Sequence, residues 1–146
     1  MTAAQENPPL RENPTLHENP TWLFVYGTLR AGSGHAMQQQ LATRAEWLQA
    51  AWVEGRLFRV SYYPGLVAGA GRVRGDLYRL PEAAALLAEL DAFEEIRGEA
   101  DDEYRRQLTA VQTADGQWRQ AWVYWYQRPV AGLQEVRGGD WLAAVR

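Results

Sequence analysis

The sequence predicts an α+β domain whose β-sheet is curled into a barrel. Segments with strand character dominate, segments with helical spacing are few, and the connections between them are mixed. The chain has 146 residues. That length suits one domain and is enough to bury a core and to form a pocket.

The N-terminal residues 1–21 differ in composition from the rest of the chain. The tripeptide Glu-Asn-Pro occurs there three times, ending at Pro8, Pro14 and Pro20. Proline removes a backbone donor and restricts the residue before it, and the residues between the repeats are mostly polar. We therefore expect a disordered or loosely docked arm at 1–21, with a plain tail favoured over a docking function, and a compact domain at 22–146.

Strands are expected where short runs of β-branched and aromatic residues are bounded by turn residues. Residues 22–26 form such a run, which Gly27 ends. Residues 48–60 have the pattern of two strands that turn at Glu54-Gly55, and Pro64-Gly65 marks another turn. The remaining strands are expected at 73–80 and in a hairpin of residues 104–113 and 117–127.

Two helices and a short helical end are expected between and after these strands. Residues 35–47 place Met37 and Leu41 at helical spacing. Pro81 opens a second helix that runs to about Glu95, since proline is tolerated at the first helical position. A short helical segment follows Trp141.

The composition excludes several kinds of chemistry. Cysteine and lysine are absent, all 15 basic residues are arginine, and there are 2 histidines. The chain therefore lacks a thiol nucleophile, a disulfide, a thiolate-bound metal, a Schiff-base lysine and a three-histidine zinc site. If the protein is an enzyme, carboxylates, hydroxyls, arginines and backbone amides must carry the reaction.

Charge and hydropathy argue against two classes of partner. The net charge is −3, whereas a nucleic-acid partner normally requires a basic face. No apolar run approaches the roughly 20 residues of a membrane helix, and the N-terminus lacks the apolar region of a secretory signal. We expect neither a nucleic-acid nor a membrane partner, and a cytoplasmic location.

One glutamate of the second helix lies on its apolar face. At about 100° per residue, four apolar side chains share a stripe that must face the core. They are Leu86, Leu87, Leu90 and Phe93. Glu94 falls in the same stripe, at the C-terminal end of the helix, where burial and the helix dipole both raise the pKa of a carboxyl. Glu94 is therefore a candidate general acid and base, and pairing with one of the many arginines is the equally weighted alternative.

The loop after the first strand is a second candidate site. It contains Tyr26, Gly27, Thr28, Leu29 and Arg30. A glycine directly after a buried strand permits a tight turn with free backbone N–H groups, which bind a carboxylate or an oxyanion. Taken alone, an ordinary turn is the favoured interpretation.

Other combinations of residues are weaker candidates. A triad of Ser33, His35 and Asp76 lacks the nucleophile elbow, and His35 is expected to be solvated. The acidic run at 99–103 lacks the alternating ligands of a calcium loop, so a solvated loop beside Arg105 and Arg106 is expected. The tryptophans are expected in the core or in an interface. Exposed tryptophans would favour a homodimer, and the oligomeric state stays open.

An ordered set of segments resembles the gamma-glutamylcyclotransferase-like family, over roughly residues 22–142. The set is Val25-Tyr26-Gly27-Thr28-Leu29-Arg30, Tyr63-Pro64-Gly65, Val73-Arg74-Gly75-Asp76-Leu77-Tyr78, Leu90-Asp91-Ala92-Phe93-Glu94, Tyr104-Arg105-Arg106, Ala121-Trp122-Val123-Tyr124 and Gly139-Asp140-Trp141. No single segment decides the match, whereas their order is specific. The chain departs from the family at Glu95, where a glycine is often found, so that either the helix runs further or the local turn differs.

The resemblance implies a small mixed barrel flanked by helices and a γ-glutamyl amide as substrate. The substrate's own α-amine would attack its γ-carbonyl, releasing 5-oxoproline and a free amine. Glu94 would act as general acid and base, and the N–H groups of Gly27 to Arg30 would bind the substrate. Tyr26 and Tyr104 would line the pocket, and no metal or organic cofactor is implied.

Two alternatives to this activity remain open at the level of sequence. The first is an enzyme that acts on a different amide, since members of the family act on γ-glutamyl amino acids, on γ-glutamyl amines from protein cross-links, or in antibiotic maturation. Otherwise the chain is a non-catalytic member that binds a small ligand in the same pocket. Retention of Glu94 on the inner face favours an enzyme over a binding module, and a purely structural protein is least favoured.

Overall fold

The structure is a computed structural model that describes residues 21–145. The expectation for the arm at residues 1–20 lies outside the described residues. Within them the chain forms six strands and three helices. These are β1 (Trp22–Val25), α1 (Ala36–Arg44), β2 (Glu46–Arg59), β3 (Pro64–Arg79), α2 (Ala83–Phe93), β4 (Tyr104–Thr113), β5 (Trp118–Tyr126), β6 (Gln134–Glu135) and α3 (Trp141–Val145).

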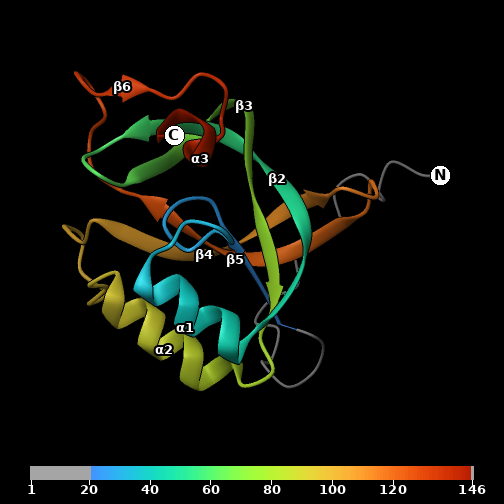
Figure 1. Cartoon of the computed structure of the whole chain (residues 1–146). Helices are drawn as coiled ribbons and strands as arrows, with labels where there is room; N and C mark the ends of the chain where they lie inside the picture. Colours follow the sequence, from blue (N-terminus) through green and yellow to red (C-terminus); the bar gives the residue numbers. More distant parts are fainter. Residues whose placement is uncertain (1–20, 146) are drawn as a thin grey trace.

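Five strands close into a mixed barrel, which confirms the predicted fold class (Figure 1). The order around the barrel is β3–β1–β5–β4–β2, and β2 pairs back onto β3. The pairing of β1 with β5 is parallel, and the other pairings are antiparallel. The short β6 adds to the outer end of β2.

The longest pairing, between β2 and β3, corrects the expectation of two strands over residues 48–60. Glu46–Arg59 is a single strand, and its register with β3 shifts between Glu54 and Arg56. Gly55 is buried at this irregularity, where a Cβ atom would lie 2.9 Å from the Val67 carbonyl oxygen. The glycine therefore marks a bulge with close backbone approach rather than a turn. The true reversal lies at residues 60–63, just before Pro64 begins β3.

The strand β1 is buried on both of its faces. Phe24 belongs to the apolar cluster inside the barrel, whereas Leu23 and Val25 belong to a second cluster between the barrel and the helices α1 and α2. This double burial explains why the run of residues 22–26 is apolar throughout instead of alternating. It also fixes the end of β1 deep in the molecule, directly before the Tyr26–Arg30 loop.

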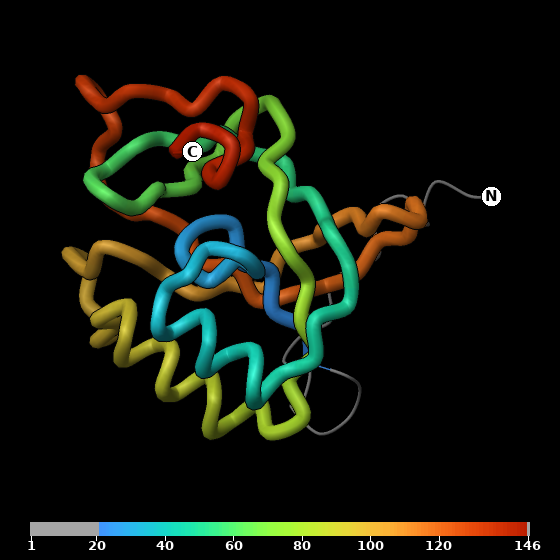
Figure 2. The backbone as a smooth tube through the Cα atoms, in the orientation of Figure 1, coloured from blue at the N-terminus to red at the C-terminus, as the bar shows by residue number. Residues whose placement is uncertain are grey.

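The helices α1 and α2 lie side by side on one side of the barrel, whereas α3 lies on the other (Figure 2). Arg44 of α1 and Glu89 of α2 are linked by an ion pair with a nitrogen–oxygen distance of 2.6 Å. Both helices are shorter than predicted. His35 caps α1 and residues from Glu46 onward already form β2, while Glu82 is the N-cap of α2, which ends at Phe93. Within residues 21–145, no helix has the length and apolar character needed to cross a membrane.

The close contact between β1 and β3 leaves no room for a side chain at one glycine, Gly75. A Cβ atom at Gly75 would lie 2.2 Å from the Val25 carbonyl oxygen and 2.5 Å from Phe24 Cζ. Backbone on one side and a buried ring on the other leave no room to relax. We expect Gly75→Ala to lower the free energy of unfolding by about 3 kcal/mol or to prevent folding.

Urea unfolding measures this change, and Gly138→Ala is the matched control. A Cβ atom at Gly138 meets no other atom within 4 Å, so the control should stay within about 0.5 kcal/mol of the wild type. Equal stability of the two variants would contradict the described β1–β3 packing.

Candidate active site

A cavity of about 320 Å³ opens where β1, the loop after it and the C-terminal end of α2 meet. Its lining comes from six separate parts of the chain. They are Phe24–Leu29, His35, Tyr62–Pro64, Phe93–Glu95, Glu103–Tyr104 and Tyr124. The structure thus brings residues 26–29, Glu94 and Tyr104 together around one cavity, as the sequence predicted, whereas Arg30, which was predicted with them, does not line it.

The loop after β1 has a fixed shape with free donors. Gly27 is required there because a Cβ atom would lie 2.8 Å from Pro64 Cγ. The Ser33 hydroxyl donates to the Thr28 carbonyl oxygen at 2.5 Å, which ties the loop to the segment before α1. No hydrogen bond within residues 21–145 uses the backbone N–H groups of Thr28 and Leu29. These two groups are therefore available to an anion at this end of the cavity.

Arg30 does not contribute to the cavity, which corrects the expectation that its N–H group binds substrate. Its backbone N–H donates to the Gly27 carbonyl oxygen at 3.0 Å, closing the turn. Its buried side chain donates from Nη1 to Asp140 Oδ1 at 2.7 Å, and its Nε lies 3.9 Å from Asp76 Oδ2. A buried guanidinium needs such carboxylate partners. Arg30 therefore anchors the base of the loop.

The triad of Ser33, His35 and Asp76, already a weak candidate from the sequence, is not assembled. Ser33 donates to Thr28, and its oxygen accepts the backbone N–H of His35 at 3.2 Å. Asp76 accepts the backbone N–H of Ala31 at 2.8 Å. The Ser33 and Asp76 side chains therefore shape the loop, while the His35 imidazole caps α1, and the three do not form a proton relay.

Glu94 occupies the C-cap of α2 at the wall of the cavity. The next residue, Glu95, has a left-handed φ of 59°. The N–H of Glu95 donates to the Ala92 carbonyl oxygen at 3.0 Å, and that of Ile96 donates to the Asp91 carbonyl oxygen at 2.9 Å. This is the Schellman arrangement, which usually places glycine at the left-handed position. The local turn is kept, and Glu95 adopts it at a cost of about 1 kcal/mol.

The carboxyl of Glu94 has an unusual electrostatic environment. Burial, and to a lesser extent the negative charges of Glu103, Asp91 and Glu95, raise its pKa from 4.5 to about 7. Among residues 21–145, no ion pair involves Glu94, so the predicted alternative of an arginine partner is wrong. A carboxyl with a pKa near 7 exchanges protons readily at neutral pH.

Phe93 and His35 lie at the mouth of the cavity, contrary to expectation. Phe93 was expected in the core but is 37% exposed, because it lies at the edge of the apolar stripe in the last turn of α2. Its ring meets that of His35 edge-on, with the centroids 5.7 Å apart. His35, expected to be solvated, is partly buried, and its Nδ1 accepts the N–H of Met37 at 3.1 Å.

Tyr26 and Tyr104 are buried walls of the cavity. The Tyr26 hydroxyl donates to the Tyr124 carbonyl oxygen at 2.5 Å, and the Tyr104 hydroxyl donates to the Pro64 carbonyl oxygen at 2.6 Å. Burial raises the pKa of both phenols above the usual value. Because their protons are committed to carbonyl oxygens, these tyrosines shape the cavity as neutral groups.

Sequence reasoning missed the residues that hold α2 in place. Arg106 of β4 donates from Nε and Nη2 to the two oxygens of Asp91, at 2.8 and 3.0 Å. The Tyr124 hydroxyl of β5 donates to Asp91 Oδ1 at 2.8 Å, and the Arg106 guanidinium stacks 4.3 Å from the centre of the Trp122 ring. Asp91 lies one turn before Glu94, so this fork fixes the catalytic candidate against the barrel. The Leu90-to-Glu94 segment was the available signal.

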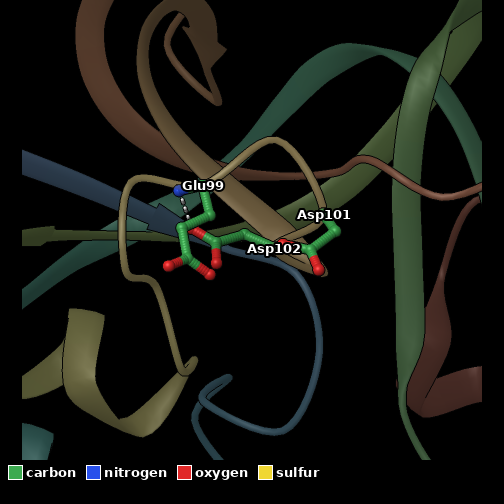
Figure 3. Close-up of side chains that lie close together, drawn as sticks. All are labelled: Glu99, Asp101 and Asp102. Carbon is green, nitrogen blue, oxygen red and sulfur yellow. Dashed lines mark hydrogen bonds between the residues drawn. The ribbon is translucent and has the colours of Figure 1, made fainter.

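The acidic run of residues 99–103 divides between two roles. Carboxylate oxygens of Glu99, Asp101 and Asp102 lie within 4.8 Å of one another (Figure 3). Asp102 is buried, and its Oδ2 accepts the backbone N–H groups of residues 97–99 at 2.8 to 3.1 Å. These donors lower the pKa of Asp102 even though burial opposes the shift. Asp102 therefore holds the loop together through its hydrogen bonds, and the loop is less solvated than expected. Glu103, in contrast, lines the cavity.

Comparison with known proteins identifies the family. The sequence model of the family described as gamma-glutamyl cyclotransferase, AIG2-like, matches residues 23–143. The chain belongs to this family. The gamma-glutamylcyclotransferase family protein YtfP of Escherichia coli K12 is 43% identical over 123 residues, which cover 82% of this chain and 95% of that protein.

One further relative and the solved structure of the Escherichia coli protein support the assignment. A protein of Vibrio cholerae named a putative gamma-glutamylcyclotransferase is 35% identical over 130 residues, covering 84% of this chain and 96% of that protein. The solution structure of Escherichia coli ytfP superposes with a TM-score of 0.60 and 39% identity, covering 86% of this chain and the whole of that chain. The mixed barrel is thus the fold of a gamma-glutamylcyclotransferase family member.

The unpaired carboxyl makes the stability of this family member depend on pH. The folded pKa of Glu94 is about 7, above the unfolded value of 4.5. Between these two pH values the unfolded chain has lost the proton that the folded chain retains, so this group lowers stability as pH rises. We expect Glu94→Gln to be more stable than the wild type at pH 8.5, by on the order of 2 kcal/mol, with little difference at pH 4.

Urea unfolding at the two pH values checks this expectation. Glu89→Gln, on the outer face of the same helix, is the control. Its carboxylate is held by Arg44, which lowers its pKa, so this variant should gain no stability at high pH. A Glu94→Gln variant that gains nothing at pH 8.5 would show that Glu94 is solvated or paired.

Proposed function

We propose that the protein is a γ-glutamylcyclotransferase that releases 5-oxoproline and a free amine from a γ-glutamyl amide. The observation that carries the proposal is the unpaired carboxyl of Glu94, whose pKa is about 7, in a cavity that also contains free backbone donors. The family assignment supports the same activity.

The proposed reaction needs no nucleophile from the protein. The α-amine of the substrate attacks its own γ-carbonyl carbon, a carbon–nitrogen bond forms, and the bond to the leaving amine breaks. The ring closure is intramolecular, so holding the substrate in a reactive conformer supplies much of the rate. This chemistry suits a chain that contains neither cysteine nor lysine.

Glu94 is assigned the role of general acid and base. The α-ammonium must lose a proton before it attacks, and the leaving nitrogen must gain one. A carboxyl with a pKa near 7 is ionised often enough to accept the first proton and acidic enough to deliver the second. Among the described residues, no arginine forms an ion pair with this carboxyl. The carboxyl is therefore free to exchange protons, which favours turnover over passive binding.

We assign to the loop after β1 the role of binding the anionic groups of the substrate. The N–H groups of Thr28 and Leu29 bind the α-carboxylate or the oxyanion that develops on the γ-carbonyl oxygen. The absence of a side chain at Gly27 lets Pro64 pack against the loop, and the hydrogen bond from Arg30 to Asp140 anchors the end of the loop. Tyr26 and Tyr104 form the neutral walls.

Substitution of Glu94 tests the proposal directly. We expect Glu94→Gln to keep the fold and to reduce 5-oxoproline release at least about 100-fold, because glutamine cannot carry the proton. The assay is chromatographic detection of 5-oxoproline from a panel of γ-glutamyl dipeptides and γ-glutamyl amines.

The control for this test is again Glu89→Gln. Glu89 lies outside the cavity, so its substitution should leave turnover close to that of the wild type. Undiminished activity of Glu94→Gln would sink the assignment of Glu94. Absence of 5-oxoproline from every substrate with the wild-type protein would overturn the proposed function.

A further inference from the structure

The charge of the cavity lining is one-sided. Three carboxylates line it, those of Glu94, Glu95 and Glu103, and no arginine does, among the part of the chain that the structure describes. Aromatic rings make up much of the remaining wall. They are Phe24, Tyr26, Tyr62, Tyr63, Phe93, Tyr104 and Tyr124. Carboxylates combined with the faces of aromatic rings are the groups that bind organic cations.

Nearby arginines do not compensate this negative charge, because their guanidinium groups are engaged elsewhere. Arg30 is buried and donates to Asp140. Arg106 forms its fork with Asp91 and stacks on Trp122. The cavity thus carries an uncompensated negative field, and the effect of Glu103 on the pKa of Glu94 shows that the two carboxylates share it.

Glu103 lies on the path between the mouth and the floor of the cavity. Its Oε2 accepts the hydroxyl proton of Tyr63 at 2.5 Å. The Tyr63 ring meets that of Tyr62 edge-on at 5.0 Å and lies 6.4 Å from that of Tyr104. Tyr62 is 78% exposed whereas Tyr104 is 6% exposed, so Tyr63 and its partner Glu103 lie between solvent and the buried wall.

Under the proposed function, the charged groups of a γ-glutamyl unit account for Glu94 and for the N–H groups of the loop after β1. Its α-ammonium faces Glu94, and its α-carboxylate or oxyanion faces the Thr28 and Leu29 N–H groups. Glu95 and Glu103 are then left for the part of the substrate beyond the scissile bond, and of these two Glu103 is the one that a hydrogen bond from Tyr63 orients. We propose that Glu103, oriented by Tyr63, binds a positive charge on the leaving amine, so that a cationic leaving amine is preferred over a neutral one of the same length.

This inference rests on the proposed function and adds the charge of the leaving group to it. A distal ammonium would gain the attraction of Glu103 and of the Tyr62 and Tyr63 ring faces, whereas a distal carboxylate would be repelled by the same field. For a partly exposed site, we expect a preference of about tenfold in kcat/KM for a cationic over a neutral leaving group. An anionic leaving group should be poorer still.

Three substrates that differ only at the end of the leaving amine test the inference. They are the mono-γ-glutamyl amides of 1,4-diaminobutane, pentylamine and 4-aminobutanoate. The quantity measured is kcat/KM for 5-oxoproline release, expressed as the ratio of the cationic to the neutral substrate. A ratio cancels any effect of a substitution on Glu94, because that effect is common to all three substrates.

We expect Glu103→Gln to reduce this ratio from about ten to near one, and Tyr63→Phe to reduce it in part, because the carboxylate is kept but is no longer oriented. Glu46→Gln is the control. Glu46 pairs with Arg79 on the outside of the barrel, and its substitution should leave the ratio unchanged.

The outcomes separate the two proposals. Release of 5-oxoproline from all three substrates at similar kcat/KM, or a ratio unchanged by Glu103→Gln, would overturn the role of Glu103 and leave the cyclotransferase activity standing. No release from any of the three, nor from other γ-glutamyl amides, would overturn the activity itself.

Discussion

The carboxyl of Glu94 lies in a cavity where no arginine among residues 21–145 pairs with it, and the rest of the site depends on that constraint. Burial and three neighbouring carboxylates raise its pKa to about 7. The fold sustains this cost because the last turn of α2 is fixed on both sides. The Schellman turn fixes its backbone, and the Asp91–Arg106 fork holds it against the barrel. A buried and uncompensated carboxyl of this kind is typical of a functional site.

The same arrangement explains where the arginines near the cavity lie. Those near the cavity are used as anchors behind it, Arg30 under the loop and Arg106 under the helix. A planar guanidinium binds a carboxylate through two hydrogen bonds and stacks on an aromatic ring, as Arg106 does with Asp91 and Trp122. Positive charge is thereby placed where it sets geometry, and the cavity itself is left acidic.

The sequence was sufficient for the barrel, the loop and Glu94, because local patterns encode them. It was insufficient wherever a tertiary contact decided the outcome. Gly55 looked like a turn, and only pairing with β3 shows it to be a bulge in one long strand. Phe93 belongs to the apolar stripe of α2, but it lies at the edge of that stripe, where the core does not cover it. Glu103 lay in an acidic run, and the direction of its side chain depends on Tyr63, 40 residues away.

With a pKa of about 7, Glu94 is a half-protonated carboxyl at neutral pH. The most direct test is a ¹³C NMR titration of the glutamate side-chain carboxyls, with the Glu94 resonance assigned by its loss in Glu94→Gln. A midpoint near pH 7 is the result that the structure predicts. A midpoint near 4.5, the ordinary value for glutamate, would mean that solvent or a cation stabilises the ionised form and would contradict the account.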